Sequence, residues 1–160
     1  MEEGLTPGKE RIVLNWEAFG RGAREFADEI GEQYQPDLVV GIARGGVIVG
    51  AVIASALEVD FFPIKVSRRM MMEVVSEEPV LVIKPYSYAA GKRVLLVDDI
   101  SRTGATMHIA RRALEKFEPV EVKTACYADR KGDGYEPDFY KLSVETDLVF
   151  PWDYALQDDA

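Results

Sequence analysis

The sequence is poor in the residues that build disulfides and metal sites. Among its 160 residues there is one cysteine, Cys126, and one histidine, His108. A single cysteine excludes a disulfide within the chain, and a lone histidine has no second imidazole with which to form a zinc site. Because Cys126 lies in an apolar segment, we interpret it as a small core residue. One cysteine also suits a reducing compartment, so we expect a cytoplasmic protein.

Long apolar runs and long basic runs are missing as well. No stretch approaches the roughly 20 apolar residues of a membrane span, and the acidic start Met1–Glu3 is unlike a secretory signal peptide. The formal net charge is −9, and basic residues cluster only locally, for example at Arg68-Arg69 and Arg130-Lys131. We therefore expect neither a membrane nor a nucleic acid as partner, but a small phosphorylated ligand.

What remains is the composition of one globular domain. Apolar residues make up 48% of the chain and charged residues 29%, which is ordinary for such a domain. Short apolar runs alternate with helical patterns, which predicts an α/β fold with a twisted, mostly parallel sheet flanked by helices. Strands are expected at residues 12–14, 38–42, 61–66, 80–83, 94–97 and 120–128, and helices at 16–34, 47–57 and 107–117.

A buried strand, two acids and a hydroxyl-rich turn follow one another in the middle of the chain. The apolar run 94–97 leads into Asp98 and Asp99 and then into Ser-Arg-Thr-Gly-Ala-Thr at 101–106. Backbone N–H groups at such a strand–helix turn, together with the hydroxyl groups and the helix dipole, form a cradle for an anion. Gly104 allows the backbone to approach the anion closely because it has no Cβ atom.

The two acids indicate what the anion carries. Asp98 and Asp99 repel a phosphate, so we expect them to face a group that needs acceptors, such as sugar hydroxyls or Mg²⁺. A phosphate at one end and a diol at the other describe a ribose 5-phosphate. The alternative is an ordinary strand–turn–helix crossover with two solvated aspartates, but the combination of features over this stretch favours the ligand site.

The same stretch resembles the phosphoribosyl-pyrophosphate (PRPP) binding motif of type I phosphoribosyltransferases, which has four apolar residues, two acidic residues and a Thr-Gly-x-Thr loop. The resemblance implies that Asp98 and Asp99 are catalytic and hold the ribose hydroxyls and Mg²⁺. It also implies a Rossmann-like fold, PRPP and a nucleobase as substrates, and a homo-oligomer. The residues implied to bind the 5-phosphate are Ser101, Arg102, Thr103, Gly104, Ala105 and Thr106.

A second strand–turn–helix unit precedes the first one. Its strand, 38–42, is followed by the turn Ala43-Arg44-Gly45-Gly46 and by the apolar helix 47–57. Ligands bind beyond the carboxyl ends of parallel strands, so we expect the two turns to hold two ends of one ligand. The resemblance implies that Ala43, Arg44, Gly45 and Gly46 bind pyrophosphate, that Arg44 is catalytic, and that the Ala43–Arg44 peptide is cis.

In the segment from about 67 to 90, apolar residues recur with no regular helical or strand spacing, apart from the strand expected at 80–83. Similar enzymes have a flexible arm here that closes over the active site and excludes water, and we expect the same of this segment. Arg68 would then contact the pyrophosphate. Three consecutive methionines, Met70 to Met72, fit packing in the core or at an interface equally well.

The family resemblance covers nearly the whole chain and divides it into a core at about 12–130 and a small hood formed by 1–16 and 131–160. Pro-Asp-Phe-Tyr at 137–140 and Phe-Pro-Trp-Asp at 150–153 resemble the end of archaeal and bacterial hypoxanthine and xanthine–guanine phosphoribosyltransferases. Carried over position by position, the resemblance implies that the base is bound by Arg130, Leu148, Phe150 and Asp153.

Two positions depart from the pattern of these oxopurine enzymes. Asp147 stands where an aromatic side chain stacks on the base, which leaves Phe150 or Tyr154 for that role, and Arg102 stands where an aspartate handles a proton near N7. Arginine stays protonated at any accessible pH, so it cannot act as a base. We favour transfer of the phosphoribosyl group to hypoxanthine, guanine or xanthine. A different acceptor, or PRPP or nucleotide sensing without turnover, stays open.

Overall fold

The computed structural model describes residues 5–7, 11–67, 69–70, 73–74, 80–83, 86–131 and 134–157. A six-stranded sheet forms its centre, with the strand order β10-β9-β8-β3-β4-β7. The first five of these strands are parallel, and β7 pairs with β4 in the antiparallel direction. The strands of this sheet are β3 (Leu38–Ile42), β4 (Asp60–Ser67), β7 (Val80–Ile83), β8 (Arg93–Ser101), β9 (Glu121–Arg130) and β10 (Phe139–Val144).

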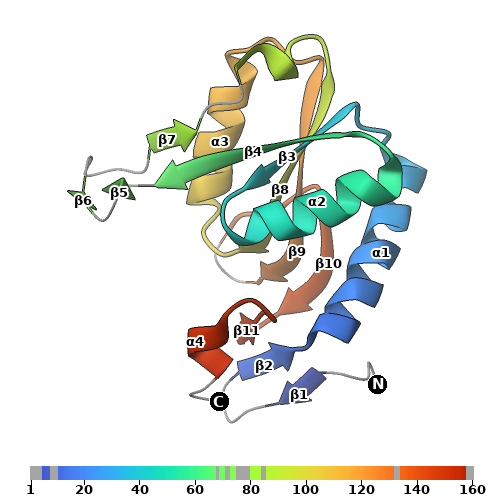
Figure 1. Cartoon of the computed structure of the whole chain (residues 1–160), viewed down its shortest axis with the longest axis vertical. Coiled ribbons are helices and arrows are strands. Elements are labelled where there is room, and N and C mark those ends of the chain that lie inside the picture. The colour runs from blue at the N-terminus through green and yellow to red at the C-terminus, as the bar shows by residue number, and fades with distance from the viewer. Residues whose placement is uncertain are drawn as a thin grey trace.

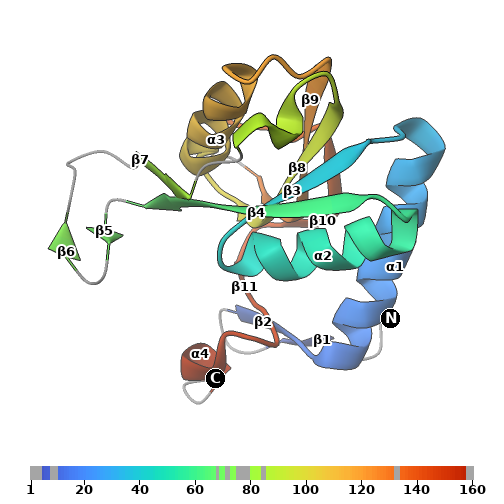
Figure 2. The same ribbon diagram turned by 45° about the horizontal axis from the view of Figure 1, so that its top comes forward.

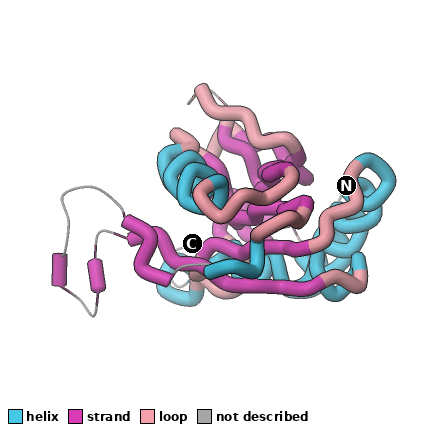
Figure 3. The backbone as a smooth tube through the Cα atoms, turned by 90° about the horizontal axis from the view of Figure 1, so that it is seen from above, coloured by secondary structure: helices cyan, strands magenta, loops and turns pink. Residues whose placement is uncertain are grey.

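Helices cover both faces of this sheet, as the sequence predicts. Two of them, α1 (Trp16–Gln33) and α2 (Gly45–Leu57), pack on one face, and α3 (Ala105–Glu115) packs on the other (Figures 1 and 3). A short 3₁₀ helix, η1 (Tyr86–Ala89), precedes β8. Within the described residues no helix is long and apolar enough to cross a membrane.

The central strands are buried on both faces because their apolar runs are continuous. Alternate side chains of β3 and β8 therefore enter two different cores. Val39 and Leu95 lie in the core beneath α1 and α2, whereas Val40 and Leu96 lie in the core beneath α3. All four side chains are fully buried.

The helix starts follow local rules. The Asn15 side chain caps α1 by accepting a hydrogen bond from the Ala18 N–H at 2.8 Å, which confirms the predicted cap. The other two helices begin slightly earlier than the apolar pattern indicates, α2 at Gly45 and α3 at Ala105. Their first residues are small, so they carry no hydrophobic signal of their own.

Within the central sheet, two strands differ from the sequence prediction by more than two residues. The strand predicted at 94–97 continues to Ser101, because β8 stays paired with β9 up to the partners Ser101 and Asp129. The sequence pattern does not predict β10. Its burial alternates only partly, as expected of a strand at the edge of the sheet, so it lacks the apolar run of the central strands.

A second, three-stranded sheet joins segments from the two ends of the chain (Figure 1). It consists of β1 (Leu5–Pro7), β2 (Arg11–Leu14) and β11 (Asp147–Val149), with β2 in the middle, and we call it the terminal sheet. The short helix α4 (Tyr154–Gln157) comes after its last strand. This pairing places the C-terminal segment 147–157 beside the start of α1.

Two short strands, β5 (Arg69–Met70) and β6 (Glu73–Val74), lie away from the central sheet (Figure 2). They pair with each other and not with that sheet. Arg68, Met71 and Met72 lie outside the described residues. The predicted closing arm and the predicted role of Arg68 therefore stay predictions.

Candidate active site

The two glycine-bearing turns meet at the carboxyl ends of β3 and β8, which are neighbours in the sheet. Gly46, in the first turn of α2, lies against β8: a Cβ atom there would be 2.5 Å from the Val97 carbonyl oxygen and 2.9 Å from Asp98 Cα. Gly45 lies against the Asp99 carboxylate, with which a Cβ atom would collide. Only glycine therefore permits the N-terminus of α2 to approach the acid pair this closely.

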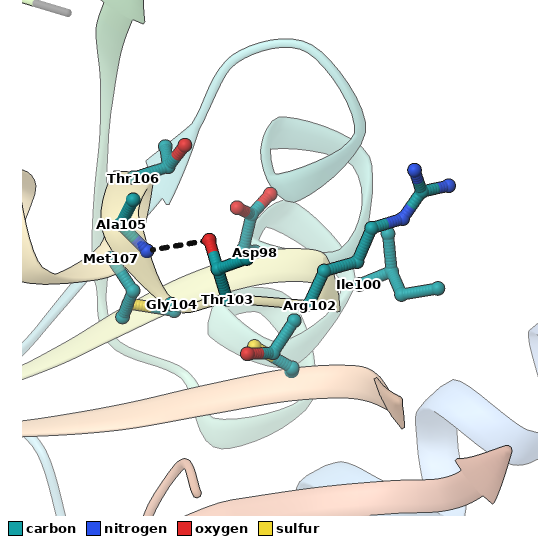
Figure 4. A pocket seen from close by; sticks show the side chains of 10 residues that line it. Asp98, Ile100, Arg102, Thr103, Gly104, Ala105, Thr106 and Met107 are labelled. Atoms are coloured by element: carbon teal, nitrogen blue, oxygen red, sulfur yellow. Dashed lines mark hydrogen bonds between the residues drawn. The ribbon is translucent and has the colours of Figure 1, made fainter. Parts of the chain in front are cut away.

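The turn after β8 forms the predicted cradle. Its cavity measures about 210 Å³ and is bounded by residues 101–107 together with Asp98, Ile100 and Cys126 (Figure 4). Gly104 is the N-cap of α3 and adopts a φ of 75°, a left-handed conformation that favours glycine. Since Gly104 has no side chain, the first N–H groups of α3 are not capped by it and can serve an anion.

Polar groups of the cradle fit an anionic ligand. The hydroxyl oxygen of Ser101 is buried and has no hydrogen-bond partner among the described residues. The Ala105 N–H donates to the Thr103 hydroxyl oxygen at a long 3.4 Å, as drawn in Figure 4. A buried polar group without a partner is costly, so a phosphate that accepts a hydrogen bond from Ser101 would relieve that cost.

A second cavity, of about 440 Å³, lies beside the first. Its wall includes Arg44 and the acids Asp98 and Asp99, and Asp98 and Thr106 border both cavities. The peptide between Ala43 and Arg44 is cis, as the resemblance implies. The structure thus brings the cationic turn, the acid pair and the cradle to one place, although the two turns are far apart in the sequence.

Burial dominates the electrostatics of the acid pair and raises the pKa of both carboxyl groups. Burial, and then the neighbouring Asp99 charge, raise the pKa of Asp98 well above its ordinary value. Burial is also the main reason why the pKa of Asp99 is raised. Backbone N–H groups partly offset this: the Asp99 N–H donates to Asp98 Oδ1 at 2.9 Å, and the Ile100 N–H donates to Asp99 Oδ1 at 2.7 Å.

The acid pair fits a magnesium ion that is held mainly by its substrate. Among the described residues no three His, Cys, Asp or Glu side chains gather into a metal site. Mg²⁺ usually binds one or two carboxylates and completes its coordination with water and substrate phosphates. A cation or a hydrogen-bonding diol beside Asp98 and Asp99 would also stabilise their charged forms.

The residues expected at the base lie in different settings. Arg130 binds the Asp147 carboxylate at 3.0 Å, and Asp153 borders the larger cavity while one of its oxygens accepts from the Phe150 N–H at 3.1 Å. Leu148 is buried and pairs with Ile12 in the terminal sheet. These contacts leave their predicted roles at the base as predictions.

Of the two rings considered for stacking on the base, Phe150 lies in the core and Tyr154 is 65% exposed, and a role of either ring at the base stays a prediction. Phe150 is 1% exposed, and its ring is stacked on that of Trp152 with centroids 4.7 Å apart. The side chain enters the core because it continues the inward alternation of β11. Trp152 is the aromatic residue that borders the larger cavity. Trp152 belongs to the Phe-Pro-Trp-Asp segment that the sequence already singles out. The sequence does not show which of its two rings is buried in the core and which one borders the cavity.

Arg102 and Asp147, the two departures from the oxopurine pattern, contact each other. The Arg102 guanidinium lies 3.5 Å from Asp147 Oδ1. In Figure 4 its side chain extends away from Thr103 and Thr106, so the guanidinium is not part of the cradle, although the residue borders the cavity. No sequence pattern indicates this contact, because 45 residues separate the partners.

Proteins of known structure share the fold described above. A purine phosphoribosyltransferase from Pyrococcus horikoshii Ot3 is 31% identical, with a TM-score of 0.79 over 89% of this chain and 94% of that one. A hypothetical protein from Neisseria gonorrhoeae with bound ppGpp shares the fold, with 21% identity and a TM-score of 0.77 over 96% of this chain and 95% of the other.

Adenine phosphoribosyltransferases are also similar in sequence. The one from Cupriavidus taiwanensis is 36% identical over 102 residues, which are 59% of this chain and 54% of the relative. The chain therefore spans about half the length of such relatives. The phosphoribosyl transferase domain matches residues 11–159, nearly the whole sequence. Because this match covers nearly the whole sequence and the fold agrees with it, the chain belongs to the phosphoribosyl transferase family.

Proposed function

We propose that this protein transfers the 5-phosphoribosyl group of PRPP to a purine base of the hypoxanthine, guanine and xanthine type, with release of pyrophosphate. One observation carries the proposal: an anion cradle and a cationic turn border adjacent cavities that share Asp98 and Thr106. A ligand with a phosphate at one end, a pyrophosphate at the other and a diol between them matches that order of charges. The similarity to a purine phosphoribosyltransferase supports a purine as acceptor.

In this proposal the cradle holds the 5-phosphate. The N-terminus of α3 supplies N–H donors and a favourable dipole, and the hydroxyl groups of Ser101, Thr103 and Thr106 supply further hydrogen bonds. Asp98 and Asp99 accept hydrogen bonds from the ribose hydroxyls and hold Mg²⁺. When bound, Mg²⁺ supplies positive charge for the departing pyrophosphate.

The turn after β3 serves the leaving group. Arg44 and the amides of Gly45 and Gly46 stabilise the negative charge that develops on pyrophosphate as its bond to C1 of the ribose breaks. A ring nitrogen of the base forms the new bond to C1 from the opposite face, so the configuration inverts. The base releases its ring proton to water, because Arg102 is already protonated and cannot accept it.

A different acceptor is the second candidate. The similar proteins from Cupriavidus are named adenine phosphoribosyltransferases. In addition, an ion pair between Arg102 and Asp147 occupies the two positions where oxopurine enzymes have an aspartate and a stacking ring. Both observations concern the identity of the base. The proposed binding of PRPP is the same for either acceptor.

The test is pyrophosphate release from PRPP and Mg²⁺ with guanine, hypoxanthine, xanthine and adenine, each offered separately. We expect turnover with the oxopurines. Replacement of both acids, Asp98→Asn with Asp99→Asn, should abolish it. Release with adenine alone would favour the second candidate. Failure of every base, with PRPP still bound, would contradict transfer and favour a sensing role.

The proposal includes a cytoplasmic location and a homo-oligomeric assembly. Light scattering coupled to size-exclusion chromatography tests the assembly: a mass of twice the 17.9 kDa chain or more is expected, and a monomer would contradict it.

A further inference from the structure

An aromatic ring packs against the cradle. Tyr135 comes from the connection between β9 and β10, and its ring contacts Gly104, the N-cap of α3. A Cβ atom on Gly104 would be 2.5 Å from Tyr135 Cβ and 2.6 Å from Tyr135 Cδ2, so no further heavy atom fits between the two residues. We propose that Tyr135 is a positioning residue that sets the affinity of the cradle for the 5-phosphate. This inference rests on the proposed function.

The position of Gly104 decides where the donors of the cradle point. Its carbonyl oxygen accepts the His108 N–H at 2.8 Å as the first bond of α3, and the N–H groups that follow Gly104 can serve the anion. Because Gly104 has no side chain and a left-handed φ of 75°, only its neighbours hold it in place. The Tyr135 ring covers one side of it and therefore limits how far the turn can move.

The hydroxyl group of Tyr135 fixes the ring. It donates to Thr124 Oγ1 at 3.1 Å, and the Thr124 hydroxyl in turn donates to Asp138 Oδ2 at 3.0 Å. This direction follows because an ionised carboxylate only accepts hydrogen bonds. Two further bonds join the same pair: the Thr124 N–H donates to Asp138 Oδ2 at 2.7 Å, and the Asp138 N–H donates to Thr124 Oγ1 at 3.1 Å. Thr124 is 1% exposed, so the acceptor of the Tyr135 hydroxyl is rigid and shielded from water.

This anchor matters because the ring has space beside it. Tyr135 also borders a third cavity, of about 450 Å³, which Asp129, Glu136 and Tyr140 line as well. A ring held by packing alone would have room to turn toward that space. Burial raises the pKa of Tyr135, so its hydroxyl keeps the proton and remains a donor to Thr124. The hydrogen bond therefore keeps the ring against Gly104.

A purely structural role of Tyr135 would affect stability alone. The ring also packs against the core beneath α3, so its loss would then lower the free energy of unfolding without changing the affinity for ligands. A positioning role instead predicts weaker binding at the cradle and unchanged binding at the turn after β3. Ribose 5-phosphate and pyrophosphate separate these two places, because the first ligand needs the cradle and the second needs Arg44.

The experiment measures binding of ribose 5-phosphate and of magnesium pyrophosphate to the whole chain by titration calorimetry. Tyr135→Phe keeps the ring but loses the anchor, and it should weaken ribose 5-phosphate binding by about 2- to 10-fold, the effect of one neutral hydrogen bond. Tyr135→Leu also loses the ring and should weaken it by about 10- to 100-fold, since a displacement of about 1 Å has effects of that size. Pyrophosphate binding should stay the same in both variants. Tyr140→Phe, which removes a tyrosine hydroxyl from the same cavity, is the matched control and should change neither ligand.

Turnover gives a second measurement: KM for PRPP should rise in the Tyr135 variants, while kcat changes less. The inference is overturned if Tyr135→Phe binds ribose 5-phosphate as the unaltered protein does, or if both ligands weaken equally. Tyr135→Phe retains the packing of the ring, so it decides the question even if Tyr135→Leu folds poorly. Binding of ribose 5-phosphate without turnover on any base would contradict the proposed transfer and leave this inference standing. An unaltered protein that binds neither ribose 5-phosphate nor PRPP would contradict both.

Discussion

The turns after β3 and β8 are the same supersecondary unit with opposite side-chain charges. Both lead from a buried parallel strand into the N-terminus of a helix, and neither helix has a side-chain cap. The turn after β3 is short and carries the exposed cation Arg44. The one after β8 carries two acids within the strand and then a hydroxyl-rich loop. A ligand that touches both must therefore have an anionic part and a hydroxyl-bearing part.

The two turns require glycine for different physical reasons. Gly45 and Gly46 have no left-handed φ; they are needed because α2 comes within van der Waals contact of β8 and its acids. Gly104 adopts a left-handed φ of 75°, and a Cβ atom there would also collide with the Tyr135 ring. One turn therefore depends on close packing alone, and the other depends on both backbone conformation and close packing.

The largest expected effect is on catalysis, from Arg44→Ala. Loss of a group that stabilises developing charge usually lowers kcat by about 10²- to 10³-fold, and we expect that range here. Stability should hardly change, since Arg44 is exposed. Steady-state pyrophosphate release and thermal unfolding measure the two quantities. Arg24→Ala, on the surface of α1, is the control. If both variants retain full activity, Arg44 has no role at the leaving group.

Gly104→Ala should act mainly on stability and on phosphate binding. A non-glycine residue in the left-handed region costs about 1–3 kcal/mol, and the contact with Tyr135 adds to that cost. Urea unfolding measures the loss. Gly20→Ala is the matched control: Gly20 lies in α1 with open space around it, so alanine there should stabilise by about 0.5–1 kcal/mol. Equal effects of the two substitutions would show that the left-handed turn is not required.

The smallest effect is a gain in stability from Asp98→Asn, although the variant should lose activity. The pKa of Asp98 is raised in the folded protein above its ordinary value of 3.8. The folded state therefore holds its proton more tightly than the unfolded state, and ionisation destabilises the fold as pH rises. Asparagine removes that cost. A gain of about 1 kcal/mol would raise Tm by a few degrees at pH 7.

The pH dependence checks the cause of this gain. Below the ordinary pKa of 3.8 the carboxyl group is protonated in both states, so the difference in Tm between Asp98→Asn and the unaltered protein should disappear there. A difference that persists unchanged at low pH would point to packing as its source.

Local sequence is enough for the elements with strong patterns. The apolar runs of β3 and β8 predict buried parallel strands, and Asn15 predicts the start of α1. The edge strand β10 escapes prediction because a half-exposed strand needs no apolar run. The sequence does not reveal the burial of Phe150 for a similar reason: a ring in a binding site and a ring in the core look alike in a sequence.

The sequence by itself determined the two strand–turn–helix units and their charges, since periodicity, glycine and hydroxyl residues act over short range. Only the tertiary structure decided that both turns border adjoining cavities and that Trp152, not Phe150, faces one of them. It alone brought Asp147 to Arg102 and Arg130. These contacts depend on strand order and on the pairing of β11 with β2, which join residues distant in the chain and leave no local pattern.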